Sequence, residues 1–364
     1  MSRSEAVPRS PGTGAGAGAE AGAEANAVRL DPASLLQLLW NGSKAIEAVQ
    51  SALDLGILAA LEEGETELGA LAARFELVPL RLYKLLDCLE SLQLAVRIAD
   101  GETVEATRYR AVPGVLDAAA RVLGPRSIER DRDRQPWRSF AGQLPELLRG
   151  SASVPRDCFD WPPATESQVA SFEQSMAAGI GPFCESFRLH AGGLFTEGTR
   201  WIDVGGGDGS LAAAVLAEAP GVRADVFNLP SVAPLVEGVR AKSAAGDRLG
   251  FVGGDFLAGG LPRGYDLLTF VRVLHDWPTD VALRLLAGAR DALPPGARIA
   301  ICEEFRTPER LAAQFFWSWF LVGVDSCVSR LREASFYVDA LERLGFVEIR
   351  ILPGPMEIVT AVRR

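Results

Sequence analysis

From about residue 199 onward, the sequence alternates short apolar runs with segments of helical periodicity. In order along the chain, these runs and segments are WIDVGGG, LAAAVLAEA, ADVFNLP, VAPLVEGVRAKS, LGFVGGDF, YDLLTFVRVL, DVALRLLAGARDAL and ARIAICEEF. Parallel strands that are buried on both faces and joined by crossover helices have this rhythm. It predicts a doubly wound α/β sheet over residues 196–364, with ligands bound beyond the carboxyl ends of the strands.

A glycine-rich turn follows the first of these predicted strands. Asp203, Gly205, Gly207 and Gly209 stand at alternate positions and lead directly into the next helix. Glycine is needed where the backbone takes a positive φ or where a ligand must approach the main chain closely. Counted from Gly205, Ser210 occupies the place of the third glycine of a dinucleotide fingerprint, and no Lys-Ser or Lys-Thr pair completes a phosphate-binding loop. The turn therefore favours an adenosyl ligand over NAD.

Polar side chains also follow the next two predicted strands. Asn228 stands where a nucleoside site of this fold places a side chain against the ribose hydroxyls, and a carboxylate is the usual choice there. The asparagine carbonyl can still accept a hydrogen bond, but without the charge of a carboxylate. Asp255 and Phe256, after the third strand, suit the exocyclic amine and the flat face of an adenine.

The chain has only two histidines, so candidates for a near-neutral general base are few. His275 follows the fourth strand, at the catalytic edge of the predicted sheet, whereas His190 lies in a helical segment and is interpreted as a surface or packing residue. Glu303 ends the fifth strand, which lies beside the fourth in a sheet of this order. It can orient the His275 imidazole, or it is simply a solvated carboxylate at a strand end.

Residues 28–112 have winged-helix order. A helix, a turn and a second helix are followed by two short strands around Asp100-Gly101. A winged helix can bind DNA, but its second helix here offers only Arg81 and Lys84 as basic residues, which favours a packing or dimerisation module.

Two further segments flank this module. Residues 1–27 contain almost nothing large enough to bury, so a disordered tail is predicted there. Residues 113–195 are predicted to form a helical linker that contributes to the acceptor pocket.

Composition and charge narrow the range of partners. A net charge of −10 and a pI near 5.0 disfavour a phosphate backbone, so no nucleic acid is expected and a small organic acceptor fits better. No run of about 18 apolar residues occurs, so no membrane segment is expected. The five cysteines lack C-x-x-C spacing, which argues against a zinc site and a disulfide framework, so no metal and a cytoplasmic location are expected.

Four motifs occur together in the order and spacing of a known family. DVGGGDG (203–209), NLP (228–230), GGDF (253–256) and LHDW (274–277) resemble those of the plant caffeate-type and bacterial small-molecule O-methyltransferases, which have an N-terminal winged-helix dimerisation domain. The resemblance covers nearly the whole chain from about Leu30. It implies a class I methyltransferase fold, S-adenosylmethionine (SAM) as the cofactor, and a homodimer. It also implies methylation of a hydroxyl on a small aromatic or polyketide-like secondary metabolite.

The same resemblance implies roles for individual residues. The cofactor-binding set is Asp203, Gly205, Gly207, Gly209, Asn228, Leu229, Asp255, Phe256 and Arg272. His275 is implied as the catalytic base, with Glu303 as its carboxylate partner and Asp276 beside it. The acceptor-binding set is Phe172, Met176 and Trp277. By spacing alone, the first two fit a helix core equally well.

Two positions depart from the pattern of the family. The ribose position is Asn228 where the family usually has aspartate, which suggests weaker SAM binding that Asn228→Asp would tighten. A second carboxylate expected near the base aligns with Leu331, and Glu333 is out of register. C- or N-methylation therefore remains an alternative, as do SAM-binding decarboxylases, hydroxylases and pericyclases. A winged-helix regulator that senses a metabolite is the alternative from another class, and the few basic residues disfavour it.

Overall fold

The structure, a computed structural model, describes most of the chain. The described residues are 32–125, 143–153, 163, 165–307, 315, 318 and 331–364. The chain divides into two compact units, Met1–Ser127 and Ile128–Arg364, and the linker expected over residues 113–195 is shared between them. The tail expected over residues 1–27 lies outside the described residues. Within the described part, no helix is both long and apolar enough to cross a bilayer.

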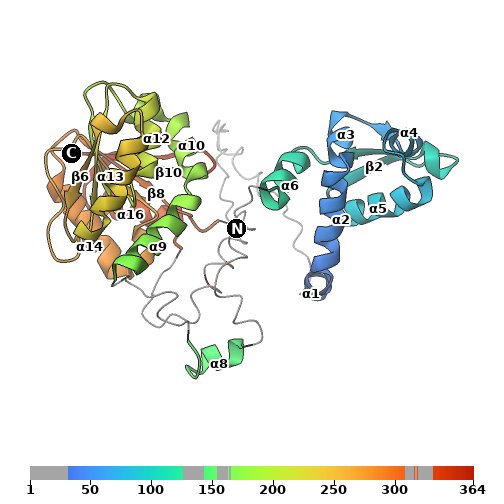
Figure 1. The fold of residues 1–364 in the computed structure, drawn as a ribbon, viewed down its shortest axis with the longest axis horizontal. Coiled ribbons are helices and arrows are strands. Elements are labelled where there is room, and N and C mark those ends of the chain that lie inside the picture. The colour runs from blue at the N-terminus through green and yellow to red at the C-terminus, as the bar shows by residue number, and fades with distance from the viewer. Residues whose placement is uncertain are drawn as a thin grey trace, which may run out of the picture. The chain divides into compact units, whose positions relative to one another are not determined.

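The second unit is built around a seven-stranded sheet with the order β6-β5-β4-β7-β8-β10-β9 (Figure 1). Its strands are β4 (Arg200–Val204), β5 (Arg223–Asn228), β6 (Leu249–Gly253), β7 (Leu267–Val271), β8 (Arg298–Cys302), β9 (Phe346–Leu352) and β10 (Ile358–Arg363). Its described helices are α8 (Leu144–Leu148), α9 (Glu166–Ala178), α10 (Gly181–Leu189), α11 (Ala191–Leu194), α12 (Ser210–Glu218), α13 (Ala233–Lys242), α14 (Thr279–Ala292) and α16 (Ala334–Arg343). The strands and helices that the alternating pattern predicts are present.

The central strands are buried on both faces, as their continuous apolar runs predict. In β7, Leu268 and Phe270 join the core cluster that also contains side chains of α14 and α16. Leu267 and Val271 of the same strand belong to the opposite cluster, which contains side chains of α10, α12 and α13. Alternate side chains of one strand therefore enter two cores, and helices cover both faces of the sheet (Figure 1).

The strand order reverses between β4 and β7. The chain runs from β4 through β5 to β6, and then returns to place β7 on the other side of β4, with all of these pairs parallel. The carboxyl ends of β4 and β7 thus become neighbours although they are far apart in sequence. Open sheets of this kind bind their ligands at such a reversal.

The C-terminal hairpin of β9 and β10 was not predicted from the sequence. Strand β10 pairs antiparallel with both β8 and β9. The connection, residues 353–357, is too short to contain a crossover helix, so the two strands must run in opposite directions. The sheet is therefore mixed at this edge and parallel elsewhere.

The first unit has winged-helix order. Its elements are α1 (Pro32–Trp40), α2 (Gly42–Asp54), α3 (Ile57–Glu63), β1 (Thr66–Glu67), α4 (Leu68–Arg74), α5 (Pro79–Ser91), β2 (Ala95–Ala99), β3 (Arg108–Ala111) and α6 (Val115–Leu123). Helices α4 and α5 form the helix-turn-helix, and β2 and β3 pair antiparallel as the predicted wing. Val115 and Ala119 of α6 join the same core, so this helix belongs to the first unit.

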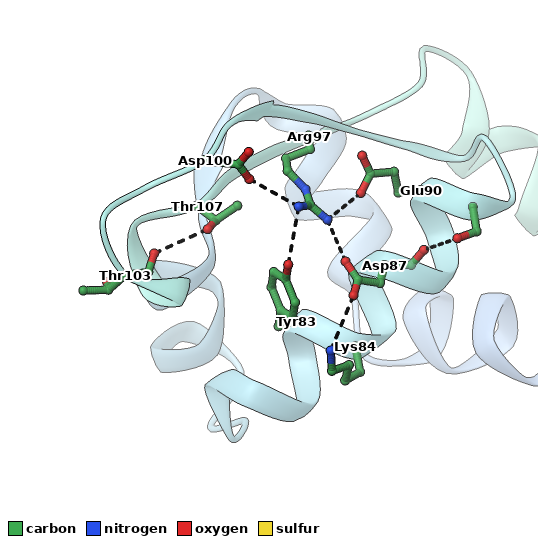
Figure 2. A network of polar contacts seen from close by, with 9 residues as sticks. Tyr83, Lys84, Asp87, Glu90, Arg97, Asp100, Thr103 and Thr107 are labelled. Carbon is green, nitrogen blue, oxygen red and sulfur yellow. Dashed lines mark hydrogen bonds and ion pairs between the residues drawn. The ribbon is translucent and has the colours of Figure 1, made fainter.

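Arg97, on β2, ties the wing to helix α5 (Figure 2). Its guanidinium donates hydrogen bonds to Asp87 at 2.7 Å, Glu90 at 2.8 Å and Asp100 at 3.2 Å. It also donates to the hydroxyl of Tyr83 at 3.4 Å. The Arg97 side chain is 25% exposed, so these contacts are partly shielded from solvent. Without the guanidinium, three carboxylates would face one another.

Replacing Arg97 by Met is expected to lower the free energy of unfolding by about 2 kcal/mol, since hydrogen bonds to charged groups contribute roughly 1.5–3 kcal/mol. The matched control is Arg74→Met, because Arg74 pairs with Glu63 where both side chains are more than half exposed, and such pairs contribute little. Urea unfolding followed by circular dichroism measures both variants. Equal effects of the two changes would contradict a stabilising role for the Arg97 network.

Candidate functional site

A cavity of about 240 Å³ lies where the strand order of the second unit reverses. Its walls come from helix α9, from the glycine-rich turn after β4, and from the residues that follow β5, β6 and β7. The cavity is thus at the carboxyl ends of the parallel strands, which is the position that the sequence pattern predicts for a ligand site.

The glycine-rich turn forms one wall of the cavity. Gly205 and Gly207 have φ angles of +70° and +60°, which other residues rarely adopt. A Cβ atom on Gly207 would stand 3.0 Å from the carboxylate of Glu173. Gly209 has a φ of +85° and precedes helix α12, and a Cβ there would meet core side chains. Gly209 therefore shapes the start of the helix, whereas Gly205 and Gly207 line the cavity.

Asp203, near the end of β4, is a buried carboxylate at the cavity wall. Its Oδ1 accepts a hydrogen bond from the Thr269 hydroxyl at 2.5 Å, and Thr269 in turn accepts one from the Trp201 indole at 2.8 Å. Oδ2 is buried and has no partner among the described residues. Burial raises the pKa of Asp203 to about 7, against the effect of the Thr269 hydrogen bond. An unpartnered buried oxygen is costly, so this group suits a ligand that carries a donor.

The ends of β5 and β6 contribute further polar groups. The Oδ1 atom of Asn228 accepts a hydrogen bond from the Leu229 backbone N–H at 2.8 Å, and its Nδ2 donates to Oε1 of Glu173 at 3.3 Å. Asp255 and Phe256, which follow β6, line the same cavity. A carboxylate and an aromatic side chain therefore line this part of the cavity.

The turn after β7 carries His275, which is 2% exposed. Glu303, at the end of β8, accepts the backbone N–H groups of Val273 at 3.0 Å and Leu274 at 2.8 Å through Oε1. Its Oε2 accepts a hydrogen bond from Nδ1 of His275. One buried carboxylate thus holds both the backbone of the turn and the orientation of the imidazole.

Asp276 approaches the other ring nitrogen of His275, with 3.3 Å between its Oδ1 and Nε2. The imidazole therefore lies between two carboxylates. Burial disfavours the charged ring, but the attraction of Glu303 and Asp276 outweighs it and holds the pKa of His275 well above its ordinary value. The two carboxylates therefore favour the charged form of the ring. Of these three residues, only Asp276 lines the cavity.

Helix α9 forms the wall opposite the strand ends and begins with a capping box at Thr165. Phe172 and Met176 are four residues apart, so they lie on one face of the helix, and both line the cavity. Arg272, a half-buried residue after β7, donates a hydrogen bond to the Met176 carbonyl, and its guanidinium lies 5.0 Å from the centre of the Phe183 ring. This contact joins α9 to the sheet.

Most of the sequence-predicted site residues come together around the cavity. Those that line it are Phe172, Met176, Asp203, Gly205, Gly207, Asn228, Leu229, Asp255, Phe256, Arg272, Asp276 and Trp277. Three predicted residues do not line it: Gly209, His275 and Glu303. Phe256 and Trp277 meet edge to face, with ring centres 5.7 Å apart, and make part of the wall aromatic.

Glu173 was not predicted from the sequence, yet it is a buried carboxylate in the cavity wall. It stands between Phe172 and Met176 on helix α9. The signal that could have revealed it is a charged residue on a helix face that is otherwise apolar, since such a residue is rarely buried without a partner. Its partner, Asn228, lies on a distant strand end, so the pair is visible only in the structure.

Arg332 is a second buried charged residue that was not predicted. It donates hydrogen bonds to the backbone carbonyls of Leu274 at 2.9 Å and Trp277 at 2.6 Å, and so holds the His275 turn from the side opposite Glu303. The neighbouring Leu331 is half-buried, and Glu333 is exposed. The second carboxylate on the histidine is therefore Asp276.

These features fit SAM, which presents an ammonium group, ribose hydroxyls and an adenine ring. The glycines leave room for close approach, Asp203 has an unpartnered buried oxygen, and Phe256 offers a flat face. Among the described residues, no group of three His, Cys, Asp or Glu side chains is arranged to hold a metal ion. Fold and cavity together define the class of SAM-dependent methyltransferases.

Comparison with known proteins agrees with this class. The O-methyltransferase domain family matches residues 164–317. Demethylspheroidene O-methyltransferase of Cereibacter sphaeroides is 30% identical over 331 residues, which cover 87% of this chain and 83% of that protein. The N,N-dimethyltransferase OxyT of Streptomyces rimosus is 29% identical over 287 residues, 76% of this chain and 79% of that protein. The crystal structure of the methyltransferase SibL in its apo form has a TM-score of 0.62 at 23% identity and covers 91% of this chain and 99% of that chain.

The chain belongs to the SAM-dependent O-methyltransferase family. It is an enzyme whose cofactor is SAM, and members of the family act on small molecules. The two relatives named above are an O- and an N-methyltransferase, so family membership leaves the acceptor open.

Gly207→Ala is expected to weaken binding of S-adenosylhomocysteine, the demethylated cofactor, by at least about tenfold, because a side chain there narrows a tightly packed wall. The matched control is Gly296→Ala. Gly296 has a φ of +84° and nothing within 4 Å of its Cβ position, so it carries a similar backbone strain of roughly 1–2 kcal/mol. Calorimetric titration measures the affinity of both variants. Equal weakening would assign the effect to strain instead of to the cavity.

Proposed function

We propose that this enzyme methylates a hydroxyl group on a small aromatic acceptor and that His275 is the general base. The observation that supports this most is that the buried His275 and Glu303 contact each other and that His275 also contacts the half-buried Asp276, which lines the cavity. The cavity wall is apolar and aromatic at Phe172, Met176 and Trp277 and acidic at Asp276, which suits a flat ring that carries a hydroxyl.

Methyl transfer to a hydroxyl requires alignment of the acceptor and removal of its proton. When bound, SAM supplies a methyl group on a sulfonium, which is already a good leaving group. Alignment can contribute on the order of 7–11 kcal/mol, and a base about 10²- to 10⁴-fold in rate. Trp277 and Phe172 position the ring, and the hydroxyl proton passes to Nε2 of His275 through the Asp276 carboxylate, which lines the cavity and lies 3.3 Å from Nε2.

The charge state of His275 sets the pH dependence of this step. A base must be neutral before it can accept a proton, but Glu303 and Asp276 hold the pKa of His275 well above its ordinary value. The fraction of neutral imidazole therefore grows as the pH rises above neutrality. Turnover is expected to increase with pH in the alkaline range, and not near the usual histidine pKa of about 6.5.

N-methylation is the second candidate. The position aligned with a second carboxylate is Leu331, and the 29% identical relative OxyT is an N,N-dimethyltransferase. An amine acceptor is itself a nucleophile once deprotonated and depends less on a base. A panel of phenols and matched anilines, assayed for methyl transfer, separates the two candidates: turnover of anilines alone would exclude O-methylation as the main activity.

His275→Gln is expected to reduce turnover of a phenolic acceptor at least about a hundredfold and to remove the rise with pH, with little change in S-adenosylhomocysteine affinity. Asp276→Asn should move the rise to lower pH, because one of the two charges that stabilise the imidazolium is lost. The matched control is His190→Gln, at a half-buried histidine that contacts the Pro353 carbonyl and does not line the cavity. Unchanged turnover and pH profile in His275→Gln would exclude this histidine as the base.

We also propose that the enzyme is a homodimer formed through its first unit. In the part of the chain that the structure describes, helix α1 (Pro32–Trp40) has no buried residue. Leu36, Leu39 and Trp40 are 66%, 65% and 87% exposed. An apolar helix left uncovered is costly in water, and a second copy of the same unit would cover it.

The double change Leu36→Glu and Leu39→Glu is expected to convert the dimer to a monomer, because two charges would be buried at the interface. Size-exclusion chromatography with light scattering measures the mass. The matched control is Leu148→Glu on α8, where the leucine is 69% exposed. A wild-type monomer, or a variant that is still dimeric, would contradict the assignment of α1 to the interface.

A further inference from the structure

The amide of Asn228 has a defined orientation at the end of β5. The Leu229 backbone N–H can only donate, so the atom that faces it at 2.8 Å must be the amide oxygen. The amide nitrogen is therefore turned toward Glu173, to which it donates at 3.3 Å. The side chain at the ribose position thus directs its acceptor to its own backbone and its donor to a carboxylate from another element.

Glu173 brings that carboxylate into the cavity from helix α9. Its side chain is 8% exposed and lines the cavity, and its Oε2 is 3.0 Å from the Cβ position of Gly207. The carboxylate therefore touches both the glycine-rich turn and the end of β5. The two oxygens of a carboxylate can accept about four hydrogen bonds, and Asn228 supplies one of them, so acceptor capacity remains for a ligand.

The groups that face Glu173 give it little neutralisation. Burial raises its pKa to about 7, the amide of Asn228 lowers it, the charge of Asp208 raises it, and the charge of Arg272 lowers it. Asp208 lies in the glycine-rich turn. Arg272 follows β7 and donates a hydrogen bond to the backbone carbonyl of Met176 on helix α9. A carboxylate that is desolvated in this way gains from a ligand that donates hydrogen bonds to it.

We propose that Glu173 is a SAM-binding residue: it supplies from helix α9 the carboxylate that Asn228 lacks, and accepts hydrogen bonds from the ribose hydroxyls of the cofactor. The proposal rests on the placement of SAM in this cavity. It also gives Asn228 a different role from the one that the sequence suggests. Asn228 is not a weakened ribose ligand but the donor that holds a relocated carboxylate in place, so the strand end and the helix share the task usually given to one acidic residue.

The relocation reverses the expectation for Asn228→Asp. From the sequence alone, an aspartate at this position should tighten SAM binding. In the structure, the Nδ2 atom of Asn228 lies 3.3 Å from Oε1 of Glu173. An aspartate at position 228 would put a carboxylate oxygen in place of Nδ2, and the two carboxylates would repel one another in a buried site. The single change is therefore expected to weaken binding, and only the exchange of both residues should restore it.

The test is a double-mutant cycle of Glu173→Gln, Asn228→Asp and the double variant, titrated calorimetrically with S-adenosylhomocysteine at pH 8. Glu173→Gln should lose at least about tenfold in affinity, as expected for a hydrogen bond to a charged group. Asn228→Asp should also lose affinity. The double variant should return to within about threefold of the wild type, because one carboxylate and one amide again face each other. Glu166→Gln, an exposed change on the same helix, is the matched control.

A second ligand tests the ribose contact itself. 5′-Methylthioadenosine keeps the adenine and the ribose but lacks the amino-acid group, so Glu173→Gln should weaken its binding by a similar factor.

Three outcomes would overturn the proposal: an undiminished affinity of Glu173→Gln for either ligand, tighter ligand binding by Asn228→Asp, or a double variant that binds as weakly as Glu173→Gln. Thermal unfolding without ligand checks that each variant is folded, and the isosteric Glu173→Gln protein decides the matter by itself if Asn228→Asp does not fold. If the wild type binds neither ligand, the cofactor placement itself is wrong.

Discussion

One buried carboxylate, Glu303, organises the turn that carries the proposed catalytic base. Glu303 is 1% exposed, and burying a carboxylate so far from water is costly unless its oxygens are hydrogen-bonded. The backbone of Val273 and Leu274 and the ring of His275 meet that requirement together. These contacts hold the turn after β7 in place, and Asp276 of this turn lines the cavity.

The same requirement explains why Arg332 lies beside this turn. Its guanidinium donates hydrogen bonds to the backbone carbonyls of Leu274 and Trp277. A carboxylate thus satisfies the donors of the turn and a guanidinium satisfies its acceptors. The catalytic histidine that we propose is held by contacts to the backbone on both sides, which suits a reaction in which alignment contributes more than proton transfer.

The part of the cavity wall that contains Asp203 and Glu173 is acidic, which suits the positive charges of SAM. The cofactor carries a sulfonium and an ammonium group, and the buried carboxylates of Asp203 and Glu173 lower the cost of enclosing these charges. Their own burial raises the pKa of each to about 7. A positively charged or hydrogen-bond-donating ligand stabilises the ionised form of each carboxyl group, which burial destabilises. Ligand binding and ionisation of these two groups are therefore coupled.

The alternating pattern was sufficient to predict the sheet, its helices and the edge at which ligands are expected to bind. Strands that are buried on both faces appear in the sequence as continuous apolar runs, and crossover helices appear as segments of helical periodicity between them. It was not sufficient for β9 and β10, whose short connection permits only an antiparallel hairpin. Motifs next to strand ends identified most of the cavity wall, since the carboxyl ends of parallel strands must converge.

Other properties were decided only by the tertiary structure. The sequence by itself pointed to the residues that we propose for the chemistry: His275, Asp276, Glu303 and the glycines of the turn. It did not determine that His275 lies between two carboxylates, or that Glu173 faces Asn228 across 55 positions of the chain. Local patterns record which side chains are buried, but the charge state of a buried group depends on partners that the fold brings from distant segments. That dependence is why the ionisation of the proposed base and the location of the proposed ribose carboxylate were visible only once the chain was folded.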